Sequence, residues 1–504
     1  MEMNVVAIDL GGSSGRVVLG KFTDDHFTLK EVHRFKEYTI QKNGYLYWDI
    51  HKIFQEIAQG LKIAKTIAPD FQSIGIDTWG VDFGLVAKDG SIKLPFSYRD
   101  RYTVKTYSKI QKQLGKRYLF EKTGLQTLPI NSLFQLAAQN DLQLLDQTQF
   151  FLMIPDLLNY MLTGIAKTEL SIASTTQLLD PDSNQWNRTL IQQIGLPQNI
   201  FPEIVTSGNF LGKVKANAVS KLPLENINVI NVAAHDTASA VYSIPELKDH
   251  LFISSGTWSL LGMEIDQPLI TKEILLADFS NEKSASGKTL LLKNLTGLWL
   301  IEEAIKDFRK SGELFDYEKI ADLITKSSDT QQHFCYFDTD DRLLALPGDI
   351  IKKIQHIAEE TQQNKPETPR EIFESIYRSL ACKYRYTIEK LAKYPELKIK
   401  EKQLVIIGGG SKSEILCQYT ANVLNKEVKS GLAEATAIGN CMMQFEVNGA
   451  ASRGKLEQII GQTTKFNIYK PTEVEKWEAD YLVYTKVMEG LANELSENRN
   501  SSNN

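Results

Sequence analysis

One group of residues near the N-terminus could bind phosphate together with a divalent cation. Asp9 directly follows the apolar run of residues 5–8. The loop after it consists of small residues and one arginine: Gly11, Gly12, Ser13, Ser14, Gly15 and Arg16. Glycines leave backbone N–H groups open to an anion, and the serines and the arginine add further donors. Because a carboxylate repels phosphate unless a cation such as Mg2+ lies between them, the stretch predicts a phosphate cradle with Asp9 near the metal.

The elements around this loop narrow its interpretation. Residues 17–19 are apolar again, so the stretch predicts a β-hairpin with a glycine-rich tip. A P-loop would need G-x-x-x-x-G-K-[ST], and a Rossmann fingerprint would lead into a helix, so both are excluded. On this stretch alone, a tight hairpin that needs glycines for its turn is as good an interpretation as phosphate binding.

A second group with catalytic chemistry surrounds Asp236. An apolar strand is expected over residues 227–232, and a helix of small residues is expected over residues 238–242. Asp236 therefore lies after a strand and at a helix N-terminus, where α/β folds place groups that face ligands. The helix would favour the ionised carboxylate, which could serve as a general base toward a hydroxyl. An ordinary helix N-cap is the alternative.

A third group interrupts a buried strand with polar residues. Asp77, Thr78 and Asp82 lie in the segment SIGIDTWGVDF, and Gly80 would let a ligand touch the backbone. Buried polar groups need partners, so the end of this strand is expected to open onto a site. Arg99 and Asp100 follow in LPFSYRD, which favours a pocket for a hydroxyl-rich ligand. A β-bulge would also explain Gly80.

A later segment repeats the hairpin pattern of the N-terminal stretch. Residues 251–265 read as a second hairpin, with Ser254, Ser255, Gly256 and Thr257 at its tip, and residues 403–424 read as strand, triple glycine and helix. We predict two α/β lobes, residues 1–244 and 245–470, that clamp a nucleotide in the cleft between them. Residues 471–504 are predicted to form a C-terminal helix that ends in a disordered tail.

Composition restricts the class of protein. The 504 residues include 57 basic and 62 acidic side chains, a net charge of −5 that gives no field to recruit nucleic acid or an anionic membrane. No apolar run reaches the ~18 residues of a membrane span, and we expect a cytoplasmic enzyme. Cys335, Cys382, Cys417 and Cys441 are far apart and form no C-x-x-C, so buried thiols are expected rather than a zinc site.

These motifs together resemble one family. DLGGSSGR, GIDTWGVDF, YRD, AAHDTASAV, SSGTWSL, KNLTGLWL and IIGGG occur in this order over about residues 4–445 and are similar to the motifs of the FGGY carbohydrate kinases. The resemblance implies two actin-like (ribonuclease H-like) domains with a nucleotide and sugar cleft between them.

The resemblance also implies an activity and a set of site residues. The activity is Mg2+-dependent phosphorylation of a sugar by ATP, and the pairing of GIDTWGVDF with HDTASAV and SSGTWSLLG points to the 1-hydroxyl of L-rhamnulose, in L-rhamnose catabolism. Asp236 would be the base, and Asp9 would hold Mg2+. The sugar would be bound by Gly80, His235, Asp236, Thr237 and Asn294. ATP would be bound by Gly12, Ser13, Ser14, Gly15, Arg16, Thr257, Glu302 and Gly409.

Two alternatives stay open. The same fold could phosphorylate another ketose or polyol, such as L-fuculose or L-xylulose, by changing its pocket contacts. An actin-like nucleotide switch would bind ATP and a partner without phosphorylating a sugar. Asp236 near the Trp79-Gly80 segment favours the kinase, because a switch needs no base facing a polyol site. The sequence predicts no oligomeric state.

Overall fold

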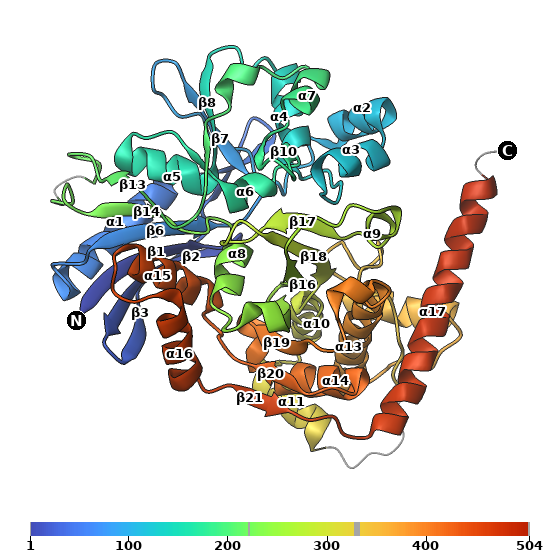
Figure 1. Cartoon of the computed structure of the whole chain (residues 1–504). Helices are drawn as coiled ribbons and strands as arrows, with labels where there is room; N and C mark the ends of the chain where they lie inside the picture. The colour runs from blue at the N-terminus through green and yellow to red at the C-terminus, as the bar shows by residue number, and fades with distance from the viewer. Residues whose placement is uncertain (1, 220–221, 327–332, 502–504) are drawn as a thin grey trace. The chain divides into compact units, whose positions relative to one another are not determined.

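The computed structural model describes residues 2–219, 222–326 and 333–501 of the chain (Figure 1). The chain forms two compact units, and each is assembled from separate stretches. The first unit comprises Met1–Lys248, Met263–Leu292 and Glu434–Lys465, and the second comprises Asp249–Gly262, Lys293–Ala433 and Phe466–Asn504. The units are defined by contacts in space and not by continuous stretches of sequence. The lobe boundaries predicted at residues 244 and 470 therefore stay predictions.

The first unit is built on a six-stranded sheet with the order β13-β14-β6-β1-β2-β3. Its strands are β1 (Met3–Leu10), β2 (Ser14–Thr23), β3 (His26–Lys36), β4 (Thr39–Lys42), β5 (Tyr45–Trp48), β6 (Ser73–Thr78), β7 (Phe83–Ala87), β8 (Thr148–Met153), β9 (Thr168–Glu169), β10 (Leu179–Asp180), β11 (Gln185–Trp186), β12 (Ile204–Val205), β13 (Asn209–Lys213), β14 (Asn228–Asn231) and β17 (Ser280–Lys283). Its helices are α1 (Ile50–Ile67), α2 (Val104–Leu114), α3 (Lys116–Thr123), α4 (Ser132–Asp141), α5 (Ile154–Thr163), α6 (Leu170–Ser174), α7 (Arg188–Gln193), α8 (Asp236–Tyr242), α9 (Lys272–Leu276), α15 (Ala435–Val447) and α16 (Arg453–Thr463), with a 3-10 turn, η1 (Gln198–Ile200).

The two faces of this sheet carry different side chains because successive strand residues point to opposite sides. Ile74 and Ile76 of β6 belong to the apolar core that α1 and α5 cover (Figure 1). The intervening Ser73, Gly75 and Asp77 face α15, where Gly75 has no room for a Cβ beside Asn440 and Gln444. Small and polar residues therefore let α15 approach the sheet closely, and hydrogen bonds replace apolar packing there.

Three neighbouring strands place the candidate catalytic groups at one edge. β14, β6 and β1 run parallel, so their carboxyl ends coincide. Asp9 lies beside Asp77 in the register of β1 and β6, and Thr78 forms a parallel bridge with His235 beyond the end of β14. The predicted first hairpin is also confirmed, because β1 and β2 pair antiparallel with Asp9 opposite Arg16.

Apolar residues at positions 53, 57, 61 and 64 predict a helix over residues 50–67, and helix α1 spans Ile50–Ile67. Asp49 caps its first turn by accepting a hydrogen bond of 3.0 Å from the Lys52 N–H, and Ile53 and Ile57 are buried in the core. Helix α8 begins at Asp236, two residues before the predicted start, with His235 as its N-cap. Asp236 is thus the first residue of the helix.

The second unit is built on six strands of a seven-stranded sheet with the order β17-β18-β16-β15-β19-β20-β21. Its strands are β15 (His250–Ser255), β16 (Trp258–Ile265), β18 (Thr289–Thr296), β19 (Gln403–Ile407), β20 (Val428–Ser430) and β21 (Asn467–Tyr469). Its helices are α10 (Trp299–Lys310), α11 (Tyr317–Thr325), α12 (Ile350–Glu360), α13 (Pro369–Leu391), α14 (Glu414–Leu424) and α17 (Val474–Ser501), with the 3-10 turns η2 (Leu247–Asp249), η3 (Pro395–Leu397) and η4 (Gly409–Lys412). The predicted second hairpin, β15–β16, and the predicted strand, triple glycine and helix are both present.

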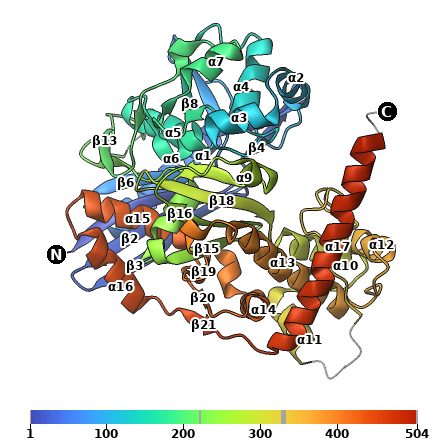
Figure 2. The ribbon, with the colours of Figure 1, turned by 45° about the vertical axis from the view of Figure 1, so that its right-hand side comes forward.

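A buried arginine holds α17 against this unit, where the first turns of α17 lie beside α13 and α14 (Figure 2). Arg378 donates to Asp480 over 2.8 Å and to Glu374 over 3.0 Å, and its guanidinium lies 4.5 Å from the ring centre of Trp477. Pairing and stacking compensate for the cost of burying this charge. The tail was predicted over residues 497–504, but α17 is helical through Ser501, and residues 502–504 lie outside the described residues.

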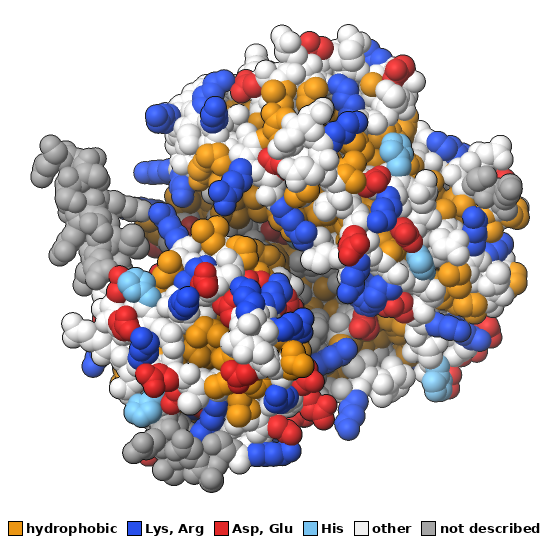
Figure 3. Space-filling model, turned by 180° about the vertical axis from the view of Figure 1, so that it is seen from behind, with side chains coloured by type: hydrophobic (Ala, Val, Ile, Leu, Met, Phe, Trp, Pro, Cys, Tyr) orange, Lys and Arg blue, Asp and Glu red, His pale blue; other side chains and the backbone are white. Residues whose placement is uncertain are grey.

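The surface charges and the state of the cysteines agree with what the composition predicts. Basic and acidic side chains are interspersed on the face shown in Figure 3. All four cysteines are buried and free, as predicted. Within the part of the chain that the structure describes, no helix is both long and apolar enough to cross a membrane.

The contact between α8 and α15 gives a prediction about stability. A Cβ on Gly439 of α15 would lie 1.8 Å from the carbonyl oxygen of Ser239 on α8, so Gly439→Ala forces the two helices apart. We expect a loss of about 1–3 kcal/mol in the free energy of unfolding, measured by urea denaturation. Gly461→Ala on α16 is the control, because its Cβ would meet open space; equal loss in both variants would contradict the account.

Candidate active site

Asp9 and Arg16 form an ion pair next to the turn of the first hairpin. Arg16 donates to Asp9 Oδ2 from Nε over 2.9 Å and from Nη2 over 2.6 Å. Its Nη1 bonds the carboxylate of Glu434, which lies just before α15. The guanidinium is therefore fixed between two carboxylates, and 17% of the side chain stays exposed. This geometry keeps a positive charge available at the hairpin.

The tip of the hairpin is a tight turn held from outside. The Gly11 N–H donates to the Ser14 carbonyl over 3.0 Å, and the Tyr38 hydroxyl donates to the Gly11 carbonyl. Arg99 donates from Nη2 to the Gly12 carbonyl over 2.6 Å. Arg99 therefore lies over the predicted phosphate loop and adds a second cation to it, rather than belonging only to a polyol pocket.

Gly15 has a structural requirement of its own. A Cβ there would lie 2.5 Å from the Phe35 ring and 2.7 Å from Leu10. The residue is buried, so packing alone explains this glycine. Its predicted contact with ATP stays a prediction, as do those of Gly12, Ser13, Ser14 and Arg16.

Asp77 lies beside Asp9 in the sheet. Its side chain is fully buried, Oδ2 accepts a hydrogen bond of 2.6 Å from Asn440, and Oδ1 has no hydrogen bond to a described group. Burial, together with the charge of Asp9, raises the pKa of Asp77 well above its usual value. Asn440 is in turn held by Gln444, which bonds to Asn440 over 2.7 Å and to the Val6 carbonyl over 3.0 Å.

Asp82 organises an aromatic wall. Its carboxylate accepts hydrogen bonds from the indole nitrogens of Trp48 and Trp79 over 2.5 and 3.0 Å, and from Gln135 over 2.8 Å. Burial raises its pKa to about 6 against these donors. The neighbouring Gly80 faces Thr175, whose side chain lies 3.0 Å from where a Cβ would be. Close packing thus explains Gly80 without a bulge, and its backbone remains a candidate for touching a ligand.

Asp236 and His235 lie together at the start of α8. Asp236 Oδ1 accepts from the Thr237 N–H over 2.6 Å and lies 3.4 Å from His235 Nε2. About a third of the Asp236 side chain, 32%, is exposed, which leaves it accessible to a substrate. Burial raises the pKa of Asp236 and His235 lowers it, with a raised pKa as the result. The structure therefore brings three predicted residues, His235, Asp236 and Thr237, into one cluster.

A buried carboxylate that the sequence analysis missed holds this cluster. Glu169 caps α6 by accepting from the N–H groups of Ser171 and Ile172, and it also accepts from the Ala234 N–H over 3.1 Å. Ser171 accepts from the His235 N–H over 3.1 Å. The sequence held only a weak signal for this residue. An acidic residue two positions before a serine can indicate a helix cap, but it does not indicate a contact with Ala234, 65 residues away.

The second unit brings together another set of predicted residues. Gly408 and Gly410 pack on Ser255 with no room for a Cβ, and Gly297 packs in the same way on Gly256. The N–H groups of Leu298 and Trp299 donate to the carbonyls of Gly256 and Thr257 over 2.9 and 3.2 Å.

The residues of this unit with predicted roles lie around those contacts. Thr257 is exposed at the hairpin tip, and Gly409 has open space where a Cβ would be. Glu302 is half-buried on α10, and burial raises its pKa. Asn294 is half-buried on β18. The second hairpin, the triple glycine and the start of α10 thus form one surface of backbone groups.

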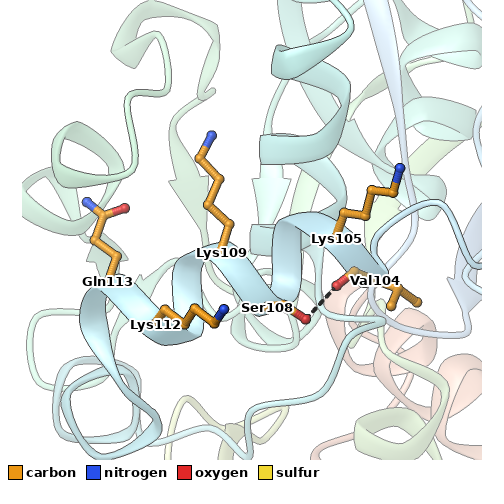
Figure 4. A pocket seen from close by; sticks show the side chains of 6 residues that line it. All are labelled: Val104, Lys105, Ser108, Lys109, Lys112 and Gln113. Carbon is orange, nitrogen blue, oxygen red and sulfur yellow. Dashed lines mark hydrogen bonds between the residues drawn. The ribbon is translucent and has the colours of Figure 1, made fainter.

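A pocket on α2 belongs to neither set. It is lined by exposed residues of this one helix: Val104, Lys105, Ser108, Lys109, Lys112 and Gln113 (Figure 4). Ser108 uses its hydroxyl to bond the Val104 carbonyl over 3.0 Å. Lys109 Nζ lies 3.5 Å from Asp141 Oδ1, and no residue with a predicted role lines this pocket.

The residues near Asp9 fit a magnesium ion in their chemistry. Both hydrogen bonds from Arg16 go to Asp9 Oδ2, and the adjacent Asp77 has a buried oxygen without a hydrogen bond. Mg2+ prefers such oxygen donors and commonly takes only one or two carboxylates, with waters and phosphates as the rest. Among the described residues, no group of three or more His, Cys, Asp or Glu could form an all-protein metal site.

Several curated proteins resemble the chain along nearly its whole length. The rhamnulokinase of Bacteroides thetaiotaomicron is 36% identical over 96% of this chain and 99% of that protein. The rhamnulokinase of Enterococcus faecalis is 37% identical over 93% of each chain. The rhamnulokinase of Bacillus subtilis is 35% identical over 94% of this chain and 96% of that protein.

Solved structures share the fold at low identity. The gluconate kinase of Lactobacillus acidophilus covers 98% of this chain and 99% of its own, with a TM-score of 0.79 and 17% identity. The Plasmodium falciparum glycerol kinase with ADP covers 96% of this chain and 97% of its own, with a TM-score of 0.76 and 16% identity. They confirm the predicted α/β fold class.

Two family models account for most of the sequence. The N-terminal domain of the FGGY family of carbohydrate kinases matches residues 4–243, and the C-terminal domain of that family matches residues 251–446. The motifs on which the predicted resemblance depended lie within these matches. The chain therefore belongs to the FGGY family of carbohydrate kinases.

Proposed function

We propose that this kinase transfers the γ-phosphoryl group of ATP to the 1-hydroxyl of L-rhamnulose, giving L-rhamnulose 1-phosphate and ADP. The observation that carries the proposal is the cluster of His235, Asp236 and Thr237 at the start of α8, where a partly exposed carboxylate is available as a base. The substrate is inferred from the three rhamnulokinases described above, each at least 35% identical over more than nine-tenths of the chain.

Asp236 would act as the general base. As the first residue of α8 it lies near the positive end of the helix dipole, which favours its anion and offsets part of the effect of burial. The anion would take the proton of the 1-hydroxyl as the phosphoryl group arrives, a contribution of roughly 10²–10⁴-fold. His235, Thr237, the Gly80 backbone and Asn294 would hold the sugar.

ATP would be bound through backbone and cationic groups, because phosphoryl transfer needs mostly positioning and charge neutralisation. In the first unit these are the hairpin residues Gly12, Ser13, Ser14, Gly15 and Arg16. In the second unit they are Thr257, Glu302 and Gly409. Asp9 would hold Mg2+, directly or through water, and the charge of that ion would offset the charge of the phosphates.

The first test is a substrate panel. We expect coupled ADP release with Mg-ATP to show its highest kcat/KM for L-rhamnulose among L-rhamnulose, L-fuculose, L-xylulose, D-xylulose and glycerol. A different preferred sugar would overturn the substrate but keep the sugar kinase. ADP release that no sugar stimulates would instead favour the nucleotide switch.

Replacing the proposed base tests the mechanism. Asp236→Asn keeps the size of the side chain and its bond from Thr237 but cannot accept the proton, so kcat should fall at least about 100-fold while ATP and sugar still bind. Turnover measures the first effect and calorimetry the second. Asp266→Asn is the control, because Asp266 is 81% exposed; wild-type turnover in Asp236→Asn would remove Asp236 as the base.

A further inference from the structure

A buried glutamate faces the histidine beside the proposed base. Glu282 lies on β17, is 6% exposed, and its Oε2 is 3.1 Å from His235 Nδ1. On its other side, His235 Nε2 is 3.4 Å from Asp236 Oδ1. The imidazole therefore lies between two carboxylates that come from separate parts of the chain.

The two facing atoms have no other hydrogen-bond partner among the described residues. Both His235 Nδ1 and Glu282 Oε2 are buried without a hydrogen bond in the described part of the chain, and only the short distance between them compensates for this. Burying a glutamate without a partner is unfavourable, because its charge loses hydration. Attraction to a protonated imidazole is the compensation that this geometry offers.

The neighbours of Glu282 fix its position. The Ser280 hydroxyl accepts from the Gln126 N–H over 3.0 Å, and Asn281 donates to the Gly124 carbonyl from its backbone over 2.9 Å and from its side chain over 3.0 Å. Lys283 donates from Nζ to the Pro181 carbonyl over 2.8 Å. All four residues of β17 are buried, so these contacts fix the strand that carries Glu282 beside His235.

We propose that Glu282 is a positioning residue that holds His235 as a cation, with its Nε2–H directed at Asp236. The cation then keeps Asp236 ionised and fixes the direction from which a sugar hydroxyl can approach it. The inference rests on the proposed function of Asp236 as the base.

The surrounding charges agree with this assignment. Burial disfavours the charged imidazole, but Glu282, Asp236 and Glu169 outweigh it and raise the pKa of His235 to about 9. The negative charge of Asp9 contributes to the raised pKa of Asp236, and the negative charge of Asp236 contributes to the raised pKa of Asp77. Because the pKa of His235 is raised, the cation persists through neutral pH and is lost only as the pH rises through about 9.

The test is Glu282→Gln, which keeps the shape and removes the charge. The pKa of His235, read by NMR of its imidazole in the protein without sugar, should fall from about 9 toward the ordinary value near 6.5. The alkaline limb of kcat against pH should move down with it, and kcat at pH 8 should fall roughly 10-fold or more. Glu282→Asp should restore part of both effects.

Asn281→Ala is the matched control on the same strand. It removes a β17 anchor but keeps the Glu282 charge, so it should lower thermal stability without moving the His235 titration. An unchanged His235 pKa in Glu282→Gln, or an equal change in Asn281→Ala, would overturn the inference. Failure of the proposed function would look different, because no sugar would stimulate ADP release by the wild type while the His235 titration stayed intact.

Discussion

The site depends on holding three carboxylates close together at one edge of a parallel sheet. Asp9 and Asp77 lie at the carboxyl ends of β1 and β6, and Asp236 follows β14, so their like charges repel one another. Each carboxylate has a different partner: Arg16 pairs with Asp9, Asn440 donates to Asp77, and His235 lies beside Asp236. A cation, a neutral amide and a titratable ring give the three carboxyl groups different electrostatic environments, which is what a site needs if one of them is to act as a base.

Packing on the α15 face makes this arrangement possible. Gly75 and Gly439 allow α15 to approach β6 and α8 so closely that no Cβ fits at either position. That approach carries Asn440 to Asp77, and it places Glu434 at the N-terminal end of α15, against Arg16. Two buried carboxylates support the residues around Asp236. Glu169 holds the loop before α8, and Glu282 lies against the His235 ring. Buried acids with partners thus position the site, whereas apolar packing on the α1 face supplies the core.

Sequence reasoning succeeded where the controlling interactions are local. The period of Ile53, Ile57, Leu61 and Ala64 was enough for the bounds of α1, and the glycine-rich tip was enough for both hairpins. It failed where a partner is distant: Glu434 lies 418 residues from Arg16, and no local pattern joins Glu282 to His235. Gly15 shows a third case, because a glycine needed for packing against Phe35 looks the same in sequence as one needed for phosphate.

The product of the reaction tests the central claim most directly. L-rhamnulose and Mg-ATP would be incubated with the enzyme, and the sugar product examined by phosphorus and proton NMR. The account predicts an ester whose phosphorus couples to the two protons on C1, formed in equal amount with ADP. A phosphate on another carbon, or free phosphate without an ester, would contradict a base at Asp236 that acts on the 1-hydroxyl.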